Sequence, residues 1–290
     1  MKKTMISIAA VVCSLSMNAQ VMKVMKGDQT VATYSAQQAD KVVFEEEGEE
    51  GQDGEAQAFT VNGVSFKMMP VEGGTFTMGA TAEQQNPDSD EKPTHRVTLS
   101  SYMMGETEVT QGLWQAVMGY TPTSGLEQWS SDYGMGTQYP AYFISWNDVQ
   151  EFITKLNQLT GKTFRMPTEA EWEYAARGGS KSRGYQYSGS NNLDDVAWYW
   201  DNSGSHPVKT KSPNELGLYD MSGNVWEWCS DRYGSYSSDA QTNPTGPSSG
   251  SYRVVRGGSW LNNARYCRVA YRNYNSPSIR SYYLGFRLAL

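Results

Sequence analysis

The stretch Pro213-Asn-Glu-Leu-Gly-Leu-Tyr-Asp-Met-Ser-Gly-Asn-Val-Trp-Glu-Trp228 carries the most information about the fold of this 290-residue chain. It sets two carboxylates, Asp220 and Glu227, on either side of the turn-forming pair Gly223-Asn224. Carboxylate and backbone carbonyl oxygens are the ligands that calcium prefers, so such a turn can wrap a hard cation. On the alternative interpretation, Asp220 caps the turn and Glu227 pairs with an arginine.

Five more phrases stand in a fixed order around this stretch. They are Gly74-Thr-Phe-Thr-Met-Gly79, Glu106-Thr-Glu-Val-Thr110, Arg165-Met-Pro-Thr-Glu-Ala-Glu-Trp-Glu-Tyr-Ala-Ala-Arg177, Arg256-Gly-Gly-Ser-Trp260 and Gly285-Phe-Arg287. Together with the first stretch they resemble the sulfatase-modifying-factor, or formylglycine-generating-enzyme, family over residues 59–290. The resemblance implies a compact, irregular domain that is related to the C-type lectin fold and is often held together by bound calcium.

Local patterns in the same region predict an α+β class with few helices and many short strands and loops. We expect helices over 110–118, over 147–159, and from 168 up to the glycines at 178 and 179. Capping boxes begin the second and third helices, with Ser145 and Asp148 in one and Thr168 and Glu171 in the other. Residues 234–251 are rich in Gly, Ser and Pro and are expected to form an exposed loop.

Large apolar and charged side chains in these phrases suit the interior of such a domain. The tryptophans are Trp172, Trp226, Trp228 and Trp260. We expect arginines to form buried pairs with glutamates: Arg177, Arg256 and Arg287 with Glu169, Glu171 or Glu227.

The N-terminal part of the chain is expected to have a different character. Residues 1–19 read as a secretory signal peptide, with Lys2 and Lys3 before an apolar stretch and Ala19 at the cleavage point. A lipoprotein signal using Cys13 is the alternative. Residues 20–44 then suit a short β segment, and residues 45–58 an acidic Gly/Glu linker. The mature protein is therefore expected to be exported, to the periplasm, the cell surface or the medium.

Composition excludes several classes of function. The chain has 24 Lys and Arg against 31 Asp and Glu, which disfavours nucleic acid as a partner. It has only 2 histidines, so a three-histidine metal site is impossible within one chain. No apolar run after residue 20 approaches the length of about 20 residues that a membrane span needs, so we do not expect a membrane-spanning protein.

Two cysteines, Cys229 and Cys267, remain after the signal peptide. In an oxidising compartment two buried cysteines are expected to pair as a disulfide. The alternative is a free thiol with chemistry of its own.

The resemblance also implies two calcium sites. The first is built from the side chains of Asp220 and Glu227 and the carbonyls of Gly223 and Val225. The second falls on Asp195, Val196, Asn202 and Gly204, in a stretch that is shorter here than in the catalytic members of the family.

The catalytic members oxidise a sulfatase cysteine to formylglycine with molecular oxygen, and two of their thiolates hold Cu(I). In the ungapped match, Asn262 stands at the first of these cysteine positions and Cys267 at the second. An amide does not replace a thiolate as a ligand of soft Cu(I), so the two-cysteine copper mechanism is expected to be absent. If activity survives with a rearranged thiol site, copper is the cofactor and Cys267 is the essential thiol.

The segment between the last two phrases is rich in Tyr, Asn, Ser and Arg. Such residues suit adaptable binding surfaces, because Tyr gives contact area at a small entropic cost and Asn gives flexible hydrogen bonds. The candidate ligand-binding residues are Tyr266, Tyr271, Asn273, Tyr274, Asn275 and Tyr282. The segment resembles the variable C-terminal region of retroelement-diversified binding proteins that share this fold. The alternative is an aromatic core strand with solvated polar neighbours.

Two classes of function follow. The first is a secreted or surface protein that binds a protein or glycan ligand outside the cytoplasm, or serves as a structural component of the envelope. The second is a sulfatase-maturing oxidase with a rearranged thiol site. We favour the first, because the missing cysteine is a chemical obstacle and a shared fold does not by itself carry function.

Overall fold

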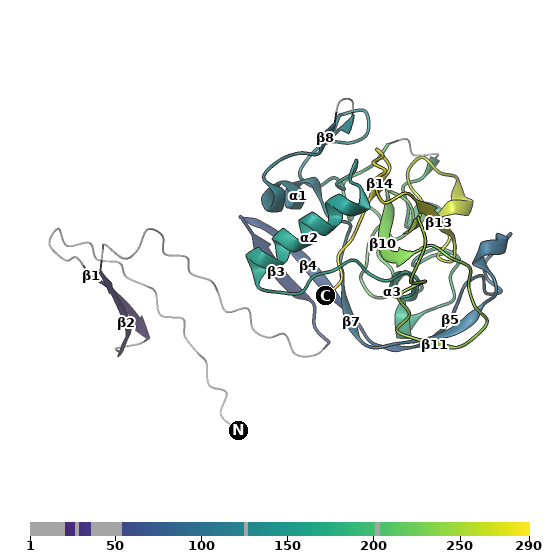
Figure 1. The fold of residues 1–290 in the computed structure, drawn as a ribbon, viewed down its shortest axis with the longest axis horizontal. Coiled ribbons are helices and arrows are strands. Elements are labelled where there is room, and N and C mark those ends of the chain that lie inside the picture. Colours follow the sequence, from purple (N-terminus) through teal and green to yellow (C-terminus); the bar gives the residue numbers. More distant parts are fainter. Residues whose placement is uncertain (1–20, 27–28, 36–53, 125–126, 201–203) are drawn as a thin grey trace, which may run out of the picture. The chain divides into compact units, whose positions relative to one another are not determined.

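A computed structural model describes residues 21–26, 29–35, 54–124, 127–200 and 204–290. The chain divides into two compact units, Met1–Glu50 and Gly51–Leu290. In the first unit, strands β1 (Val21–Lys26) and β2 (Gln29–Ser35) pair antiparallel (Figure 1). The expected signal peptide over 1–19 and most of the expected linker lie outside the described residues.

The centre of the second unit is a four-stranded mixed sheet in the order β13-β12-β10-β14. Its strands are β10 (Trp226–Arg232), β12 (Arg253–Arg256), β13 (Arg272–Asn275) and β14 (Leu284–Gly285). Strand β10 runs antiparallel to β12 and parallel to β14, so segments far apart in sequence meet here. Strand β13 lies at one edge of the sheet.

Two three-stranded sheets and a small hairpin complete the β structure. The first sheet holds β3 (Gln57–Val61), β4 (Val64–Val71) and β7 (Tyr102–Gly105). The second sheet holds β5 (Gly74–Met78), β6 (His95–Leu99) and β11 (Gln241–Thr242). In the hairpin, β8 (Thr123–Ser124) pairs with β9 (Glu127–Gln128). Strand β3 begins two residues inside the segment expected to be linker, over 45–58. The C-terminus extends the first of these sheets, because Leu290 and Met103 exchange backbone hydrogen bonds of 3.0 and 3.1 Å.

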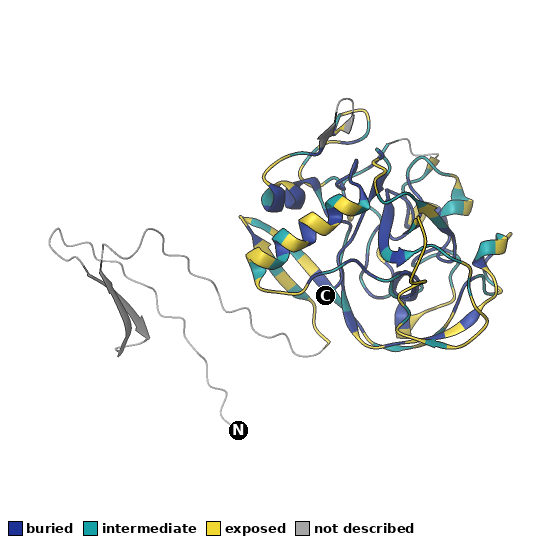
Figure 2. Cartoon of the chain, viewed as in Figure 1, coloured by how far each residue is buried: buried dark blue, intermediate teal, exposed yellow. Residues whose placement is uncertain are grey.

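The three α-helices among the described residues confirm the local sequence patterns. They are α1 (Gln111–Met118), α2 (Trp146–Thr160) and α3 (Glu169–Ala176). Both expected capping boxes are present, and Gly119 and Gly161 end α1 and α2 in the left-handed conformation that glycine adopts without strain. One face of α2 is buried and the other is exposed (Figure 2). The α+β class with few helices is therefore confirmed.

Aromatic side chains fill much of the core. Trp114 of α1 stacks on Phe152 of α2 with 5.3 Å between ring centroids, and Phe286 meets Phe152 edge-on at 5.2 Å. A second apolar cluster forms around Trp172 of α3. Full burial of a phenylalanine contributes roughly 1.5–3 kcal/mol, so these clusters hold the short elements together.

The connection between β10 and β12 follows the expected exposed loop for most of its length. However, Gln241–Thr242 pairs in parallel with β6, and Tyr236 points inward to contact Glu169. Among the described residues, no helix has the length and apolar character needed to cross a membrane.

Candidate binding surface and metal positions

Four buried arginines fix the C-terminal segment to the rest of the domain. Arg256 binds Glu173, Arg268 binds Glu91, Arg272 binds Glu169 and Arg287 binds Glu227. The last three pairs are bidentate, with N–O distances between 2.6 and 2.8 Å. Bidentate pairs of this kind fix orientation as well as distance, so the backbone between the anchors is held in place.

The expected arginine pairs are confirmed in part. Arg287 binds Glu227, and Arg256 reaches Glu169 at 3.3 Å as well as its closer partner. Arg177 instead pairs with Glu173 at 2.9 Å and with Glu83 at 2.6 Å.

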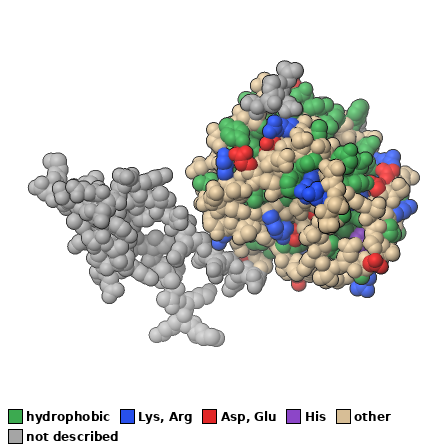
Figure 3. Space-filling model, in the orientation of Figure 1, with side chains coloured by type: hydrophobic (Ala, Val, Ile, Leu, Met, Phe, Trp, Pro, Cys, Tyr) green, Lys and Arg blue, Asp and Glu red, His purple; other side chains and the backbone are tan. Residues whose placement is uncertain are grey.

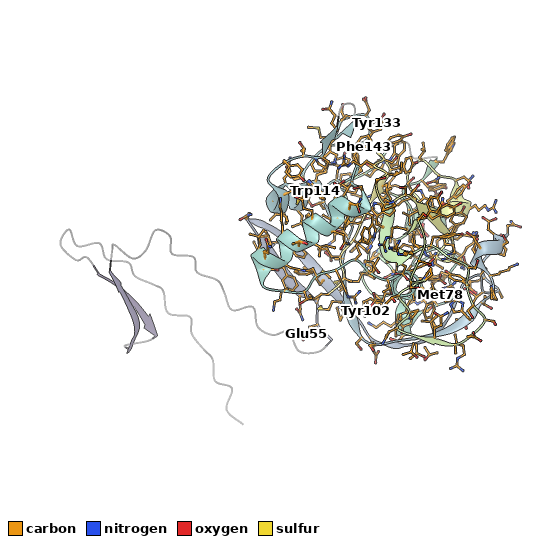
Figure 4. All side chains as sticks on the ribbon, in the orientation of Figure 1. Glu55, Met78, Tyr102, Trp114, Tyr133 and Phe143 are labelled. Carbon is orange, nitrogen blue, oxygen red and sulfur yellow. The ribbon has the colours of Figure 1, made fainter. Side chains whose placement is uncertain are left out.

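Between the anchors, Tyr282 belongs to a half-buried aromatic cluster. Its ring stacks on Tyr133 with 4.4 Å between centroids and an interplanar angle of 17°, and Trp260 and Phe143 lie at 5.8 and 6.2 Å. Figure 4 shows Tyr133 and Phe143 beside each other at the same end of the domain. The neighbouring Trp200 is 63% exposed, and its backbone N–H donates to the carbonyl of Asn262 at 2.8 Å.

Tyr274 belongs to a second aromatic group, on the edge strand β13. It is 42% exposed and packs against Tyr233 at 4.3 Å and Tyr252 at 4.9 Å. Asn273 and Asn275 flank it on the same strand, and the Asn273 side chain accepts the backbone N–H of Tyr274 at 2.8 Å. In Figure 3, hydrophobic side chains gather on the part of the surface where Figure 1 draws β13 and β14.

The other two candidate tyrosines, Tyr266 and Tyr271, pack against each other. Tyr271 is only 9% exposed and packs against Trp226 at 6.0 Å and Tyr266 at 4.9 Å. Burial raises the pKa of Tyr271 to about 12. Tyr271 is therefore a core residue, as the alternative interpretation of the segment holds, and Tyr266 is half-buried against it.

The thiols of Cys229 and Cys267 are free and buried, so the disulfide expected between these two residues is wrong. Cys229 on β10 lies in the apolar cluster around Trp172, whereas Cys267 lies with Tyr187 and Leu193 in another. Burial raises the pKa of both thiols, that of Cys267 to about 12. Export and an even cysteine count suggested a pair, but each thiol is packed separately.

Asn262 takes part in a local hydrogen-bond network. Its side-chain oxygen accepts from Trp226 Nε1 at 2.8 Å and from Ser259 Oγ at 2.7 Å. Cys267 Sγ lies 3.9 Å from the carbonyl of Asn263 and is fully buried. Across the described parts of the chain, no three His, Cys, Asp or Glu side chains group closely enough to hold a metal ion.

The carboxylates of the first expected calcium site have different environments. Both oxygens of Glu227 bind Arg287, and Trp172 Nε1 donates to one of them at 2.6 Å, so Glu227 follows the alternative arginine pairing. Asp220 Oδ2 accepts the backbone N–H of Lys209 at 2.9 Å, but its buried Oδ1 has no hydrogen-bond partner. Asp220 therefore fits a cation ligand, and Glu227 does not in this arrangement.

Glu108 adds a third buried carboxylate beside Asp220. It accepts hydrogen bonds from the backbone N–H of Val225 and from the Asn224 side chain, at 3.3 and 3.1 Å. Burial, with nearby Asp220, raises its pKa well above the usual value, and burial raises that of Asp220 to about 6. Of these three buried carboxylates, Glu227 forms the ion pair with Arg287, so a proton or a cation has to balance the charge of Glu108 and Asp220.

Three residues of the second expected calcium set lie in the described part of the chain. The two oxygens of Asp195 accept from Asn192 Nδ2 at 2.9 Å and from Ser190 Oγ at 3.0 Å, within its own turn. Val196 is buried, and Gly204 has a φ of 95°. Asn202 lies outside the described residues.

With this geometry in place, the chain can be compared with known proteins. Residues 54–290 match the protein family described as the sulfatase-modifying factor enzyme 1-like domain. The chain belongs to this family. It is 33% identical over 260 residues to the chaperone protein LppX of Paenibacillus barcinonensis, which covers 72% of this chain and 83% of that one. It is also 33% identical over 279 residues to the formylglycine-generating enzyme of Streptomyces coelicolor, and this match covers 75% of this chain and 87% of the enzyme.

Solved structures of related proteins share the fold. The sulfatase-modifying factor domain superimposes on Treponema denticola variable protein 1 with a TM-score of 0.70 and 36% identity, covering 81% of this chain and 98% of that one. Its TM-score with PvdO from Pseudomonas aeruginosa is 0.66 at 28% identity, and the superposition covers 77% of this chain and 93% of PvdO.

Sequence reasoning missed several contributors to this family member's surface. Tyr133 and Phe143 stand in a loop without periodicity, and only the fold brings them to Tyr282. No role was predicted for Arg268 and Arg272, and the structure shows that both form buried ion pairs. The signal that could have found them is the presence of arginines in a segment without acidic residues, because a buried arginine there requires a carboxylate from elsewhere in the fold.

Proposed function

We propose that this sulfatase-modifying factor family member is a ligand-binding protein that acts outside the cytoplasm rather than a formylglycine-generating oxidase. The observation that carries the proposal is that the C-terminal segment contains both buried anchoring side chains and exposed aromatic side chains. Arg268 and Arg272 are buried in ion pairs, while Tyr274 and Tyr282 occupy exposed or half-buried positions among other aromatic rings. Such a surface offers contact area without needing a reactive group.

The thiol chemistry supports the same proposal. A thiolate, not a thiol, is the ligand of a metal and the nucleophile of cysteine chemistry. Burial opposes ionisation of Cys267, and the amide of Asn262, already engaged by Trp226 and Ser259, stands where the resemblance implies the partner thiol.

The names of two relatives support a binding role. One is called a variable protein, which favours a surface that changes between related proteins, as in the retroelement-diversified alternative. Another is called a chaperone protein, which favours a protein over a glycan as the ligand. Export of the chain rests on the signal-peptide pattern over residues 1–19.

Photo-crosslinking in the cells of origin tests this function. A photoreactive phenylalanine analogue replaces Tyr274 or Tyr282 in the full chain, and Tyr120 serves as the control because it is 47% exposed and lies outside the C-terminal segment. We expect discrete adducts from positions 274 and 282 that position 120 does not give, and digestion with protease or glycosidase identifies their class. The same adducts from all three positions, or none at 274 and 282, would contradict the proposal.

A second function is favoured by the 33% identity to a formylglycine-generating enzyme. On that alternative, Cys267 is the essential thiol and copper is the cofactor. Purified protein would then convert a peptide containing Cys-x-Pro-x-Arg, which would lose its thiol and gain an aldehyde in the presence of copper and oxygen. We expect no aldehyde, and its appearance in the native chain but not in Cys267→Ser would establish the oxidase.

We also propose calcium as a structural cofactor at Asp220, with the carbonyls of Gly223 and Val225 as further ligands. The unpartnered Oδ1 of Asp220 and the excess of buried carboxylate charge support it. Thermal unfolding after treatment with a chelator, and again after addition of calcium, provides the test. Calcium should raise the melting temperature of the native protein and leave that of Asp220→Ala unchanged.

A further inference from the structure

The loop that follows β10 folds back over a charged pocket that the proposed function does not use. The pocket has a volume of about 330 Å³ and lies between the start of α3, β6 and the edge of the central sheet. The titratable side chains in its lining are His95, Glu169, Asp231, Arg232, Tyr236 and Arg272. Its outer wall consists of loop residues 234–237 and 244–247.

Specific contacts close this loop over the pocket. Tyr236 donates its hydroxyl to Glu169 Oε1 at 3.1 Å, and the Arg272 guanidinium lies 3.9 Å from the centroid of the Tyr236 ring. Arg272 Nη1 also donates to the carbonyl of Gly234 at 2.8 Å. At the other end of the loop, Gly246 has a φ of 74°, and a Cβ there would come within 3.1 Å of Asp231 Oδ1. The loop backbone therefore lies directly against the Asp231 carboxyl group.

The two carboxylates under the loop, Glu169 and Asp231, differ in their ion pairs. Glu169 binds Arg272 and reaches Arg256, whereas Asp231 makes no ion pair with any described residue and is only 4% exposed. Asp231 Oδ2 accepts the Glu169 backbone N–H and the Ser230 hydroxyl, each at 3.0 Å. Burial and, next, the nearby Glu169 carboxylate raise the pKa of Asp231 to about 7.

Other elements add both signs of charge around Asp231. The groups are Glu169 and Glu171 of α3, Arg253 and Arg256 of β12, Arg272 of β13, His95 of β6 and Tyr236 of the loop. The Arg253 guanidinium faces the Trp146 ring at 3.7 Å, donates to the Ser230 carbonyl and forms no ion pair with Asp231 in the described structure. A negative charge on Asp231 would consequently be buried with two hydrogen-bond donors but no ion-pair partner among the described residues.

We propose that residues 233–247 form a pH-sensitive latch, closed while Asp231 is protonated and released when Asp231 loses its proton. Release lets water reach the Asp231 carboxylate, which relieves the energetic penalty of an unpaired buried charge. Protonation and closure are thereby linked, since the closed form binds the proton more tightly than the open form.

The latch touches the proposed binding surface through its first residue. Tyr233 packs on Tyr274 at 4.3 Å, and its backbone N–H donates to the carbonyl of Tyr252 at 3.0 Å. Its hydroxyl donates to Asp90 at 2.7 Å. Release of the loop therefore loosens the support of Tyr274. Regulation of ligand binding by pH rests on the proposed function, but the latch itself does not.

Hydrogen exchange read by mass spectrometry tests the latch without any ligand. The full mature protein is compared with Asp231→Asn, which keeps the acceptor oxygen but carries no charge. Protection factors, which correct for the intrinsic effect of pH, are measured for peptides covering 233–250 and for α2 as an internal control. Protection of the loop should fall about tenfold between pH 6 and pH 8.5 in the native chain, and not in Asp231→Asn. An equal fall in both proteins, or none in the native chain, overturns the proposal.

Thermal unfolding of the same two proteins provides a check on folding. Asp231→Asn should melt at a higher temperature than the native chain at pH 8.5 and at nearly the same temperature at pH 4, where the unfolded carboxyl group also begins to hold its proton. If the variant instead melts lower at both pH values, the buried carboxyl is a simple structural acceptor and the latch is refuted. Neither measurement uses a ligand, so the latch can be confirmed even if the crosslinking experiment contradicts the proposed binding function.

Discussion

Arg287 binds both carboxylate oxygens of Glu227, with Nε to Oε2 at 2.6 Å and Nη2 to Oε1 at 2.7 Å. Both side chains are buried, and the same guanidinium donates to the carbonyls of Gly105 and Tyr219. One ion pair therefore joins β10 and the C-terminal residues to β7 and to the turn before Asp220.

Replacing Arg287 with methionine should strongly destabilise the domain. The substitution leaves the Glu227 carboxylate buried without its partner, and breaking such a pair lowers the free energy of unfolding by about 3–5 kcal/mol. Chemical denaturation measures the loss. Lys155→Met is the control, because Lys155 pairs with Glu151 on the exposed side of α2 and should change the free energy by less than about 1 kcal/mol. Equal losses in both variants would show that the buried pair is not a main support.

Alanine at Tyr271 and at Tyr274 should differ strongly in its effect on the free energy of unfolding. Tyr271 is packed in the core, so Tyr271→Ala should lower the free energy of unfolding by about 3 kcal/mol through loss of contacts and a cavity. Tyr274 is 42% exposed, so Tyr274→Ala should change the free energy of unfolding by less than about 1 kcal/mol. Denaturation curves of the two variants measure both changes. A large loss from Tyr274→Ala would place that ring in the scaffold.

The helices could be predicted from the sequence because their determinants are local. Ser145 with Asp148 and Thr168 with Glu171 cap their helices within four residues, and Gly161 ends α2 at the next position after its last turn. The pairing of Arg287 with Glu227 was also among the expected options, since a buried arginine requires a carboxylate.

Long-range partners could not be predicted in the same way. Glu91 and Arg268 are 177 residues apart, and no local pattern connects Tyr133 with Tyr282. The alternation of Tyr and Asn in the C-terminal segment likewise did not separate the inward Tyr271 from the outward Tyr274, because the segment turns between them into β13. Composition predicted the kind of surface, and the fold decided which side chains belong to it.

Stability should depend on the charge of Asp220 in calcium-free buffer. Burial raises its pKa in the folded protein to about 6 from the usual 3.8, so the folded state holds a proton that the unfolded state has lost. The free energy of unfolding should therefore fall as pH rises from about 4 to 6, by at most about 3 kcal/mol. Asp220→Asn should make this fall smaller by the part that Asp220 contributes, because Glu108 and Asp231 also have raised pKa values, and denaturation with chelator at pH 4, 6 and 8 measures it. A native chain that gains stability across this window would contradict the assignment.

Alkylation of the thiols should distinguish a packed core from a reactive site. Burial raises the pKa of Cys229 and Cys267, so few thiolates form at pH 8 and the native protein should react with iodoacetamide far more slowly than the denatured protein. Mass spectrometry of mature protein from its native compartment should find both residues unpaired and, after denaturation, both fully alkylated. Rapid alkylation of native Cys267 that changes on addition of Cu(I) would instead favour the oxidase, because only an accessible thiolate responds to a soft metal ion in this way.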